Sequence, residues 1–231
     1  MLDFISSVAV LIAALTFIAG VSAWRREFVG KRRIELAESV LAMFYEAEDI
    51  IKQIRNPVSF VGEGNTRKRE EKELKEDSLL LDRAYIVIER YQKREALFSQ
   101  IRSIRYRVKA MFGTPASEPF DELDTIINEI FSAAQMLGSH YWPRQGRVEM
   151  ASEEFKNHLE EKHRYETVIW YMGEENDTVT PRVKEIIANI ENVLQDAFVS
   201  QDNFAAGALD DIKYYVGMWT RVFKKQEPNN K

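Results

Sequence analysis

An uncharged segment near the N-terminus constrains this chain more than any other feature. From Phe4 to Trp24 there are 21 residues without a charged side chain. Its few polar residues are Ser6, Ser7, Thr16 and Ser22. A helix of this length, at about 1.5 Å per residue, spans roughly 30 Å, which is the thickness of the hydrocarbon core of a bilayer. A helix that packs on a soluble core normally keeps a polar face, and this segment has none. We therefore predict that residues 1–24 form a transmembrane anchor.

The charges on either side of this segment predict its orientation. Met1-Leu2-Asp3 precede it without a Lys or Arg, whereas several basic residues follow it. Because positively charged flanks stay in the cytoplasm, we expect the short N-terminus outside and residues 25–225 as a cytoplasmic domain. Small residues up to Ala23 leave cleavage after that position open, but a signal peptide would begin with basic residues, so an uncleaved anchor is favoured.

The residues that follow the apolar run are the predicted membrane interface. An aromatic ring such as that of Trp24 suits the headgroup level, and each basic residue near an anionic leaflet contributes about 1 kcal/mol of attraction. The predicted interface consists of Trp24, Arg25, Arg26, Lys31, Arg32 and Arg33. Small residues four positions apart inside the run also permit two anchors to pack together, so a homo-oligomer is a further possibility; they are Ala9, Ala13, Ala19 and Ala23.

Beyond the anchor, apolar residues recur at three- and four-residue steps, which indicates amphipathic helices. The clearest stripe covers three heptads, as in helices that pack side by side: Phe120, Leu123, Ile127, Ile130, Ala134, Leu137 and Tyr141. No segment alternates with period two. We predict an all-α antiparallel bundle of about five to six helices, in which the first helix continues from the anchor. The first helix is expected to end at residue 55. The other expected helices cover 79–112, 120–141, 152–173, 180–197 and 205–222, and a polar tail follows at 226–231.

Two segments lack a clear apolar stripe. Residues 58–77 are rich in Gly and then in mixed charge, so we expect an exposed loop and a frayed helix start. Its GEGNTRK stretch, residues 62–68, lacks the spacing and the preceding strand of a phosphate-binding loop. In the helix expected over 152–173, His158 and Lys162 interrupt the apolar positions, which predicts a peripheral helix. Those apolar positions are Phe155, Leu159, Tyr165, Ile169 and Met172.

Few residues suggest catalysis or metal binding. The chain has no cysteine, which excludes disulfides, thiol nucleophiles and cysteine-ligated metals. Glu160-x-x-His163 is half of the signature of di-iron bundles, but such a site needs two copies and two further carboxylates. Serine-nucleophile motifs are absent. We therefore predict no cofactor and no metal site, and favour a protein without enzymatic activity.

A group of basic residues on the helix expected over 79–112 is a second candidate surface. Arg102, Arg105 and Lys109 fall at i, i+3 and i+7, with Arg94 nearby, and could bind an anionic group or a partner. The alternative is a solvated face paired with neighbouring carboxylates. A net charge of −5 argues against nucleic acid as the ligand.

These features together favour a single-span membrane protein whose cytoplasmic helical bundle is an interaction or scaffolding module. Its predicted partners are the lipid bilayer and another protein. The alternatives are a membrane-tethered signalling or stress effector that oligomerises, and a helical metalloprotein or enzyme.

Overall fold

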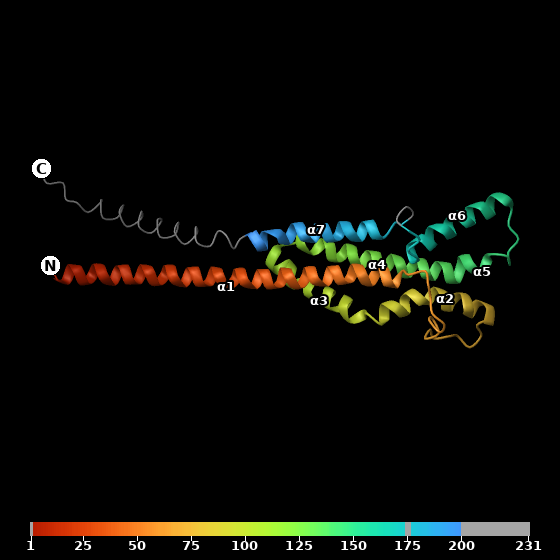
Figure 1. Ribbon diagram of the computed structural model, residues 1–231, viewed down its shortest axis with the longest axis horizontal. Coiled ribbons are helices and arrows are strands. Elements are labelled where there is room, and N and C mark those ends of the chain that lie inside the picture. The colour runs from red at the N-terminus through yellow and green to blue at the C-terminus, as the bar shows by residue number, and fades with distance from the viewer. Residues whose placement is uncertain (1, 174–176, 200–231) are drawn as a thin grey trace. The chain divides into compact units, whose positions relative to one another are not determined.

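The computed structural model describes the backbone of residues 2–173 and 177–199, without the side chains of residues 2–5, 8, 9, 11, 12, 15 and 199. Every regular element in this part of the chain is helical, which confirms the predicted all-α class. Figure 1 labels the α-helices, which are α1 (Leu2–Ile54), α2 (Lys75–Gln92), α3 (Glu95–Phe112), α4 (Glu118–Met136), α5 (Trp142–Arg144), α6 (Ser152–Ile169) and α7 (Thr180–Val199). A 3-10 turn η1 (Pro115–Ser117) precedes α4, and a π-helical turn η2 (Leu137–Tyr141) follows it.

The chain divides into two compact units. One comprises residues 39–193, and the other comprises the described parts of residues 1–38 and 194–231. The packing described below concerns residues 39–193, and the predicted membrane-interface residues of the other unit are described separately. The helix predicted over 205–222 and the tail predicted over 226–231 lie outside the described residues.

Helix α1 is unbroken from Leu2 to Ile54, as the sequence predicted, and stops just before Asn56-Pro57. A proline disfavours the helical conformation of the residue before it, which explains this end. In the part of the chain that the structure describes in full, no helix is long and apolar enough to cross a membrane. The membrane span predicted over residues 1–24 therefore has no structural support, and it stays a prediction.

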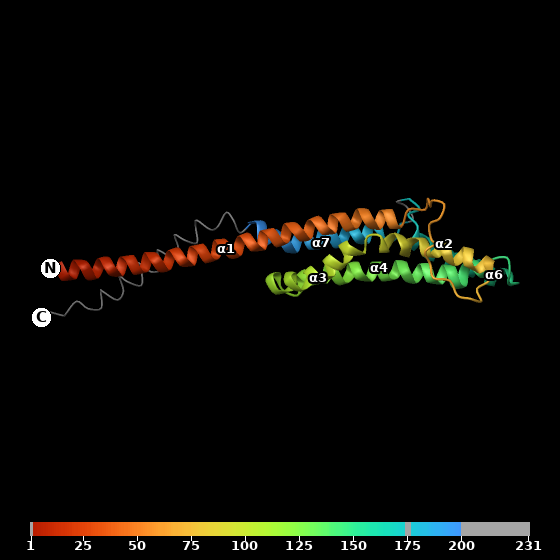
Figure 2. The ribbon, with the colours of Figure 1, turned by 90° about the horizontal axis from the view of Figure 1, so that it is seen from below.

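Helices α1, α4 and α7 pack against one another. Tyr45 of α1 donates a hydrogen bond to Glu191 of α7 over 2.6 Å, while Arg55, just past the end of α1, donates to Thr180 at the start of α7 over 3.2 Å. These two contacts show that α7 runs antiparallel to the second part of α1, and Figure 2 shows the two helices side by side there. Phe44 packs edge-on against Phe120, with ring centroids 4.9 Å apart, and so joins α1 to α4.

The heptad stripe of α4 and η2 supplies the centre of this core. Six of its seven predicted positions are buried, and Tyr141 is half-buried. Apolar residues at three- and four-residue steps on α1 and α7 are also buried in this unit; they include Ala47, Ile51, Ile54, Val183, Ile186 and Ile190.

The single helix predicted over 79–112 is wrong, because the chain turns at Lys93–Arg94 and separates α2 from α3. Tyr91 and Phe98 stack with their ring centroids 4.9 Å apart. In a straight helix, residues seven apart are separated by about 10 Å along the axis, so this stacking requires a turn between them. Tyr91 also packs edge-on against Phe131 of α4, which fixes the turn through tertiary contact.

Helix α6 begins at Ser152, as predicted, but its buried side differs from the expected one. His158 is buried, whereas Phe155 and Met172 are exposed. The ring of His158 lies against Tyr141 of η2, with centroids 5.4 Å apart. His158, a polar interruption in the sequence stripe, is therefore part of the helix interface, and Phe155 faces outward. Met172 lies beyond the helix, because α6 ends at Ile169 and not at the predicted residue 173.

Candidate functional site

The segment that joins α1 to α2, residues 55–74, is ordered by ion pairs and is named here the α1–α2 loop. Arg67 donates to Glu73 and, over 2.9 Å, to Asp82 of α2, while Arg69 reaches the other oxygen of Asp82 over 2.6 Å. The hydrogen bonds from Arg67 lower the pKa of Glu73 to about 2. The exposed loop predicted over 58–77 is confirmed as far as Leu74, where most residues are exposed, and α2 begins at Lys75. The structure adds that the mixed charges of this loop pair with one another and with α2.

Gly64 brings the α1–α2 loop into direct backbone contact with α2. Its N–H donates to the carboxylate of Glu89 over 2.7 Å, and its backbone has φ +85°, a conformation that glycine adopts readily. Burial opposes ionisation of Glu89, but hydrogen bonds from Lys93, Thr66 and Gly64 outweigh it and lower the pKa of Glu89. GEGNTRK is thus a structural connection and does not form a phosphate loop.

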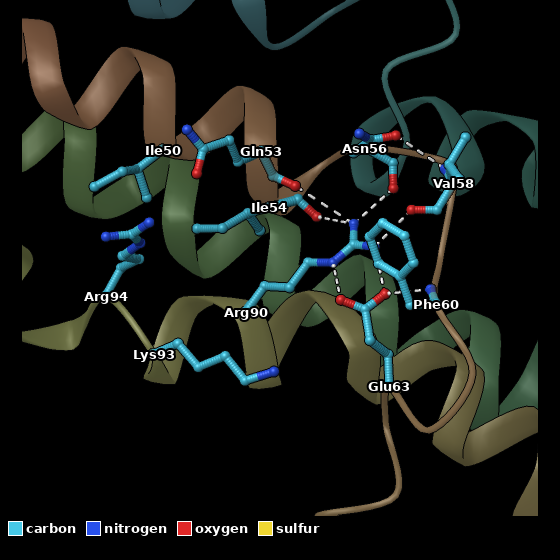
Figure 3. A pocket seen from close by; sticks show the side chains of 10 residues that line it. All are labelled: Ile50, Gln53, Ile54, Asn56, Val58, Phe60, Glu63, Arg90, Lys93 and Arg94. Carbon is cyan, nitrogen blue, oxygen red and sulfur yellow. Dashed lines mark hydrogen bonds and ion pairs between the residues drawn. The ribbon is translucent and has the colours of Figure 1, made fainter.

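Arg90 of α2 holds the other end of the loop at the C-terminus of α1 (Figure 3). Its guanidinium donates to the backbone carbonyls of Ile54, Asn56 and Val58 over 3.2, 2.6 and 2.7 Å. It also donates twice to Glu63, over 3.0 and 2.7 Å. A cation at the C-terminal carbonyls of a helix is favourable, because they carry partial negative charge. The hydrogen bonds from Arg90 lower the pKa of Glu63.

A cavity of about 280 Å³ opens beside Arg90, and we name it the Phe60 cavity. Figure 3 shows its lining, which comprises Ile50, Gln53, Ile54, Asn56, Val58, Phe60, Glu63, Arg90, Lys93 and Arg94. The side chain of Phe60 at its rim is 77% exposed, and its neighbours Val58 and Val61 are exposed as well. The α1–α2 loop, which is fixed by hydrogen bonds and ion pairs, therefore exposes three apolar side chains to solvent next to an open cavity.

A second polar cluster joins α1, α6 and α7 in the interior. Arg55 is fully buried and donates to the carbonyls of Thr167 and Val168, each over 2.8 Å, and to Asp177 over 2.7 Å. Asp177 also accepts hydrogen bonds from the amides that begin α7. Burial disfavours the charged form of Asp177, but the hydrogen bond from Arg55 and those from the α7 start outweigh it and lower the pKa of this carboxyl. The sequence reasoning missed both residues; an Asp three residues before Thr180-Pro181 was the available signal.

His158 is the other buried ionisable group between helices. Its Nε2 atom is buried without a hydrogen-bond partner in the described structure. Burial lowers the pKa of His158, and the nearby positive charge of Arg144 lowers it further. The imidazole is therefore neutral near pH 7, because burial and the charge of Arg144 both disfavour its cationic form.

This burial predicts that acid weakens the fold through His158. Below the ordinary histidine pKa of about 6.5, His158 binds a proton in the unfolded chain but stays neutral in the folded chain until a lower pH is reached. The free energy of unfolding therefore falls as the pH drops. We expect denaturant titrations from about pH 7.5 to about pH 5.5 to show a smaller loss of stability in His158→Gln than in the natural chain. His163→Gln, at an exposed position of the same helix, is the matched control for the loss of a histidine. Equal slopes in all three proteins would contradict the prediction.

The predicted basic strip is only partly paired. Arg105 bonds to Asp121, and Arg102 lies 3.5 Å from Asp124 and donates to the Tyr91 hydroxyl over 3.1 Å. Lys109 is exposed farther along α3, and Arg94 lies at the α2–α3 turn, not on the same helix. Arg94 also lines the Phe60 cavity.

The predicted membrane-interface residues all lie on α1. Trp24, Arg25, Lys31 and Arg32 are exposed, and Arg26 and Arg33 are partly buried. Trp24 stacks on Phe28 with centroids 6.0 Å apart, and the guanidinium of Arg32 lies over the same Phe28 ring at 5.1 Å. No structural finding tests their contact with lipid.

Glu160 and His163 of the half di-iron motif are both exposed on α6. Over the described residues, no group of three or more His, Cys, Asp or Glu side chains is placed to hold a metal ion.

This chain was compared with protein families, curated proteins and solved structures. No family model, no curated protein and no solved structure matches this chain.

Proposed function

We propose that this chain is a membrane-anchored interaction module without enzymatic activity. In this proposal residues 1–24 span the bilayer, the residues from Trp24 to Arg33 lie at its cytoplasmic surface, and the helical bundle binds another protein. The uncharged run and the basic residues that follow it support the anchor and its orientation. An anchor raises the effective concentration of the bundle toward partners in the same membrane.

The observation that carries the interaction role is the exposed apolar group Val58, Phe60 and Val61. Single exposed apolar residues are common on protein surfaces, whereas a group of them marks contact sites. Here three occur within four residues on the α1–α2 loop, whose backbone is bonded to Arg90 and Glu63. Exposing these three apolar side chains to water on an ordered loop stabilises the fold through no buried contact, which supports a role for them in binding.

Membrane extraction tests the anchor. We expect the full chain to stay in the membrane pellet after alkaline carbonate washing, because a hydrophobic helix of about 20 residues is not released by loss of surface charge. A chain that lacks residues 1–24 is the control and should be released. Protease added outside intact cells should leave the bundle uncut. Release of the full chain, or cleavage of the bundle from outside, would contradict the anchor or its orientation.

Chemical crosslinking in the same membranes tests the interaction role. The proposal expects adducts of the chain with a different protein. A ladder at multiples of the mass of the chain alone would support the oligomerising effector in its place, and a strictly monomeric band would argue against both.

A further inference from the structure

The lining of the Phe60 cavity combines an apolar floor with positive charge at the rim. Ile50 and Ile54 of α1 are buried beneath it, and Phe60 stands at its edge. A dry apolar cavity of about 150 Å³ already holds a benzene-sized group. A cavity of about 280 Å³ therefore has room for one large aliphatic or aromatic side chain from another molecule.

The charges around the cavity do not cancel. Arg90 is neutralised by Glu63, and Lys93 donates to Glu89 over 2.7 Å. Arg94 is exposed at the cavity, and its guanidinium has no hydrogen-bond or ion-pair partner among the described residues; Figure 3 labels it with Ile50 among the residues that line the cavity. A guanidinium binds a carboxylate with two parallel hydrogen bonds, so the uncompensated group at this rim is complementary to Asp or Glu.

The rim is also arranged before any partner arrives. The N–H of Phe60 donates to Glu63 over 3.0 Å, and Glu63 is in turn held by Arg90. Binding through side chains on an already ordered backbone avoids much of the entropy cost of association. An exposed aromatic side chain beside a pocket, with an arginine nearby, has the composition of the residues that dominate protein interfaces.

We propose that the Phe60 cavity binds a segment of a partner protein that carries a large apolar side chain close to an Asp or Glu. The apolar side chain enters the cavity above Ile50 and Ile54, the carboxylate pairs with Arg94, and Phe60 covers the apolar group. This inference rests on the proposed interaction function and names the site and the chemistry of the partner.

Selection from a random peptide display library against the full chain in lipid nanodiscs tests this site. The recovered peptides should combine an aromatic or large aliphatic residue with an acidic residue a few positions away. One such peptide, made synthetically, should bind Arg94→Glu and Phe60→Ser at least about tenfold more weakly, since each variant removes one charge-assisted or apolar contact. Both side chains are exposed, so both variants should keep the unfolding midpoint of the natural chain.

Lys109→Glu is the matched control, because it reverses the charge of an exposed basic residue on α3 away from the cavity. It should bind the peptide as the natural chain does. Recovery of no acidic–apolar motif, or equal loss of binding in Lys109→Glu and Arg94→Glu, would overturn the proposal. Recovered peptides that copy a segment of this chain would assign the site to a second copy and also overturn it. Crosslinking to another protein in membranes together with a failed selection would leave the proposed function standing and remove this site.

Discussion

Arg55→Met is expected to lower the free energy of unfolding by about 3–5 kcal/mol, because it leaves a buried carboxylate without its cation. The methionine keeps most of the apolar volume but leaves Asp177 uncompensated, and the carbonyls of Thr167 and Val168 lose their donor. Whole domains are stable by only about 5–15 kcal/mol, so this single change removes a large share of the total. Denaturant unfolding followed by circular dichroism measures it.

Arg182→Met is the matched control. Arg182 forms an exposed ion pair with Glu129 at 2.6 Å, and exposed pairs contribute about 0–1 kcal/mol. If Arg55→Met does not fold at all, Asp177→Asn keeps the shape of the cluster and should give a smaller but measurable loss. Equal effects of Arg55→Met and Arg182→Met would show that the buried cluster does not hold α1, α6 and α7 together.

Gly64→Ala is expected to destabilise the protein by about 3 kcal/mol, because two penalties act at one position. A Cβ atom there would overlap the backbone carbonyl of Asp82, coming within 2.8 Å of its carbon, and backbone atoms cannot move aside as a flexible side chain can. The φ of +85° is also unfavourable for alanine. Thermal or denaturant unfolding measures the combined loss.

Gly62→Ala separates the two penalties. Gly62 lies in the same loop with φ +95°, but the nearest atom to an added Cβ is 3.9 Å away. It should therefore lose only the conformational part, about 1–2 kcal/mol. If Gly64→Ala lost no more than Gly62→Ala, the close approach of the α1–α2 loop to α2 would be disproved.

Helix ends and buried faces were predicted correctly where residues within the same segment determine them. The end of α1 before Asn56-Pro57 follows from the conformational preferences of those residues. Helix α6 begins at Ser152, but its N-cap is Ala151 and no side chain caps it. The buried stripe of α4 follows from strict three- and four-residue spacing. The turn at Lys93–Arg94 had no such signal, because no proline or glycine marks it and aromatic contacts with Phe131 produce it.

The candidate sites were harder to predict from the sequence. Arg94 was proposed as part of a basic strip with Arg102, Arg105 and Lys109, and the structure places it at the α2–α3 turn, where it also lines the Phe60 cavity. The exposed group at Phe60 lies in the segment that was predicted to be an exposed loop. The ion pairs that hold this loop were not predicted, since sequence composition does not show which charges pair. Charge pairing across helices depends on which faces meet, and that is a tertiary property.

The sequence by itself determined the helical class, most of the buried faces and the uncharged run that predicts an anchor, because each depends on residues within a few turns of one another. Only the tertiary structure decided that Arg55 is buried against Asp177, 122 positions away, and that His158 faces inward. It also decided that the α1–α2 loop is held beside an open cavity. A polar side chain is buried only where distant segments supply its partners or exclude water. The periodicity of one segment does not show which distant segments pack against it.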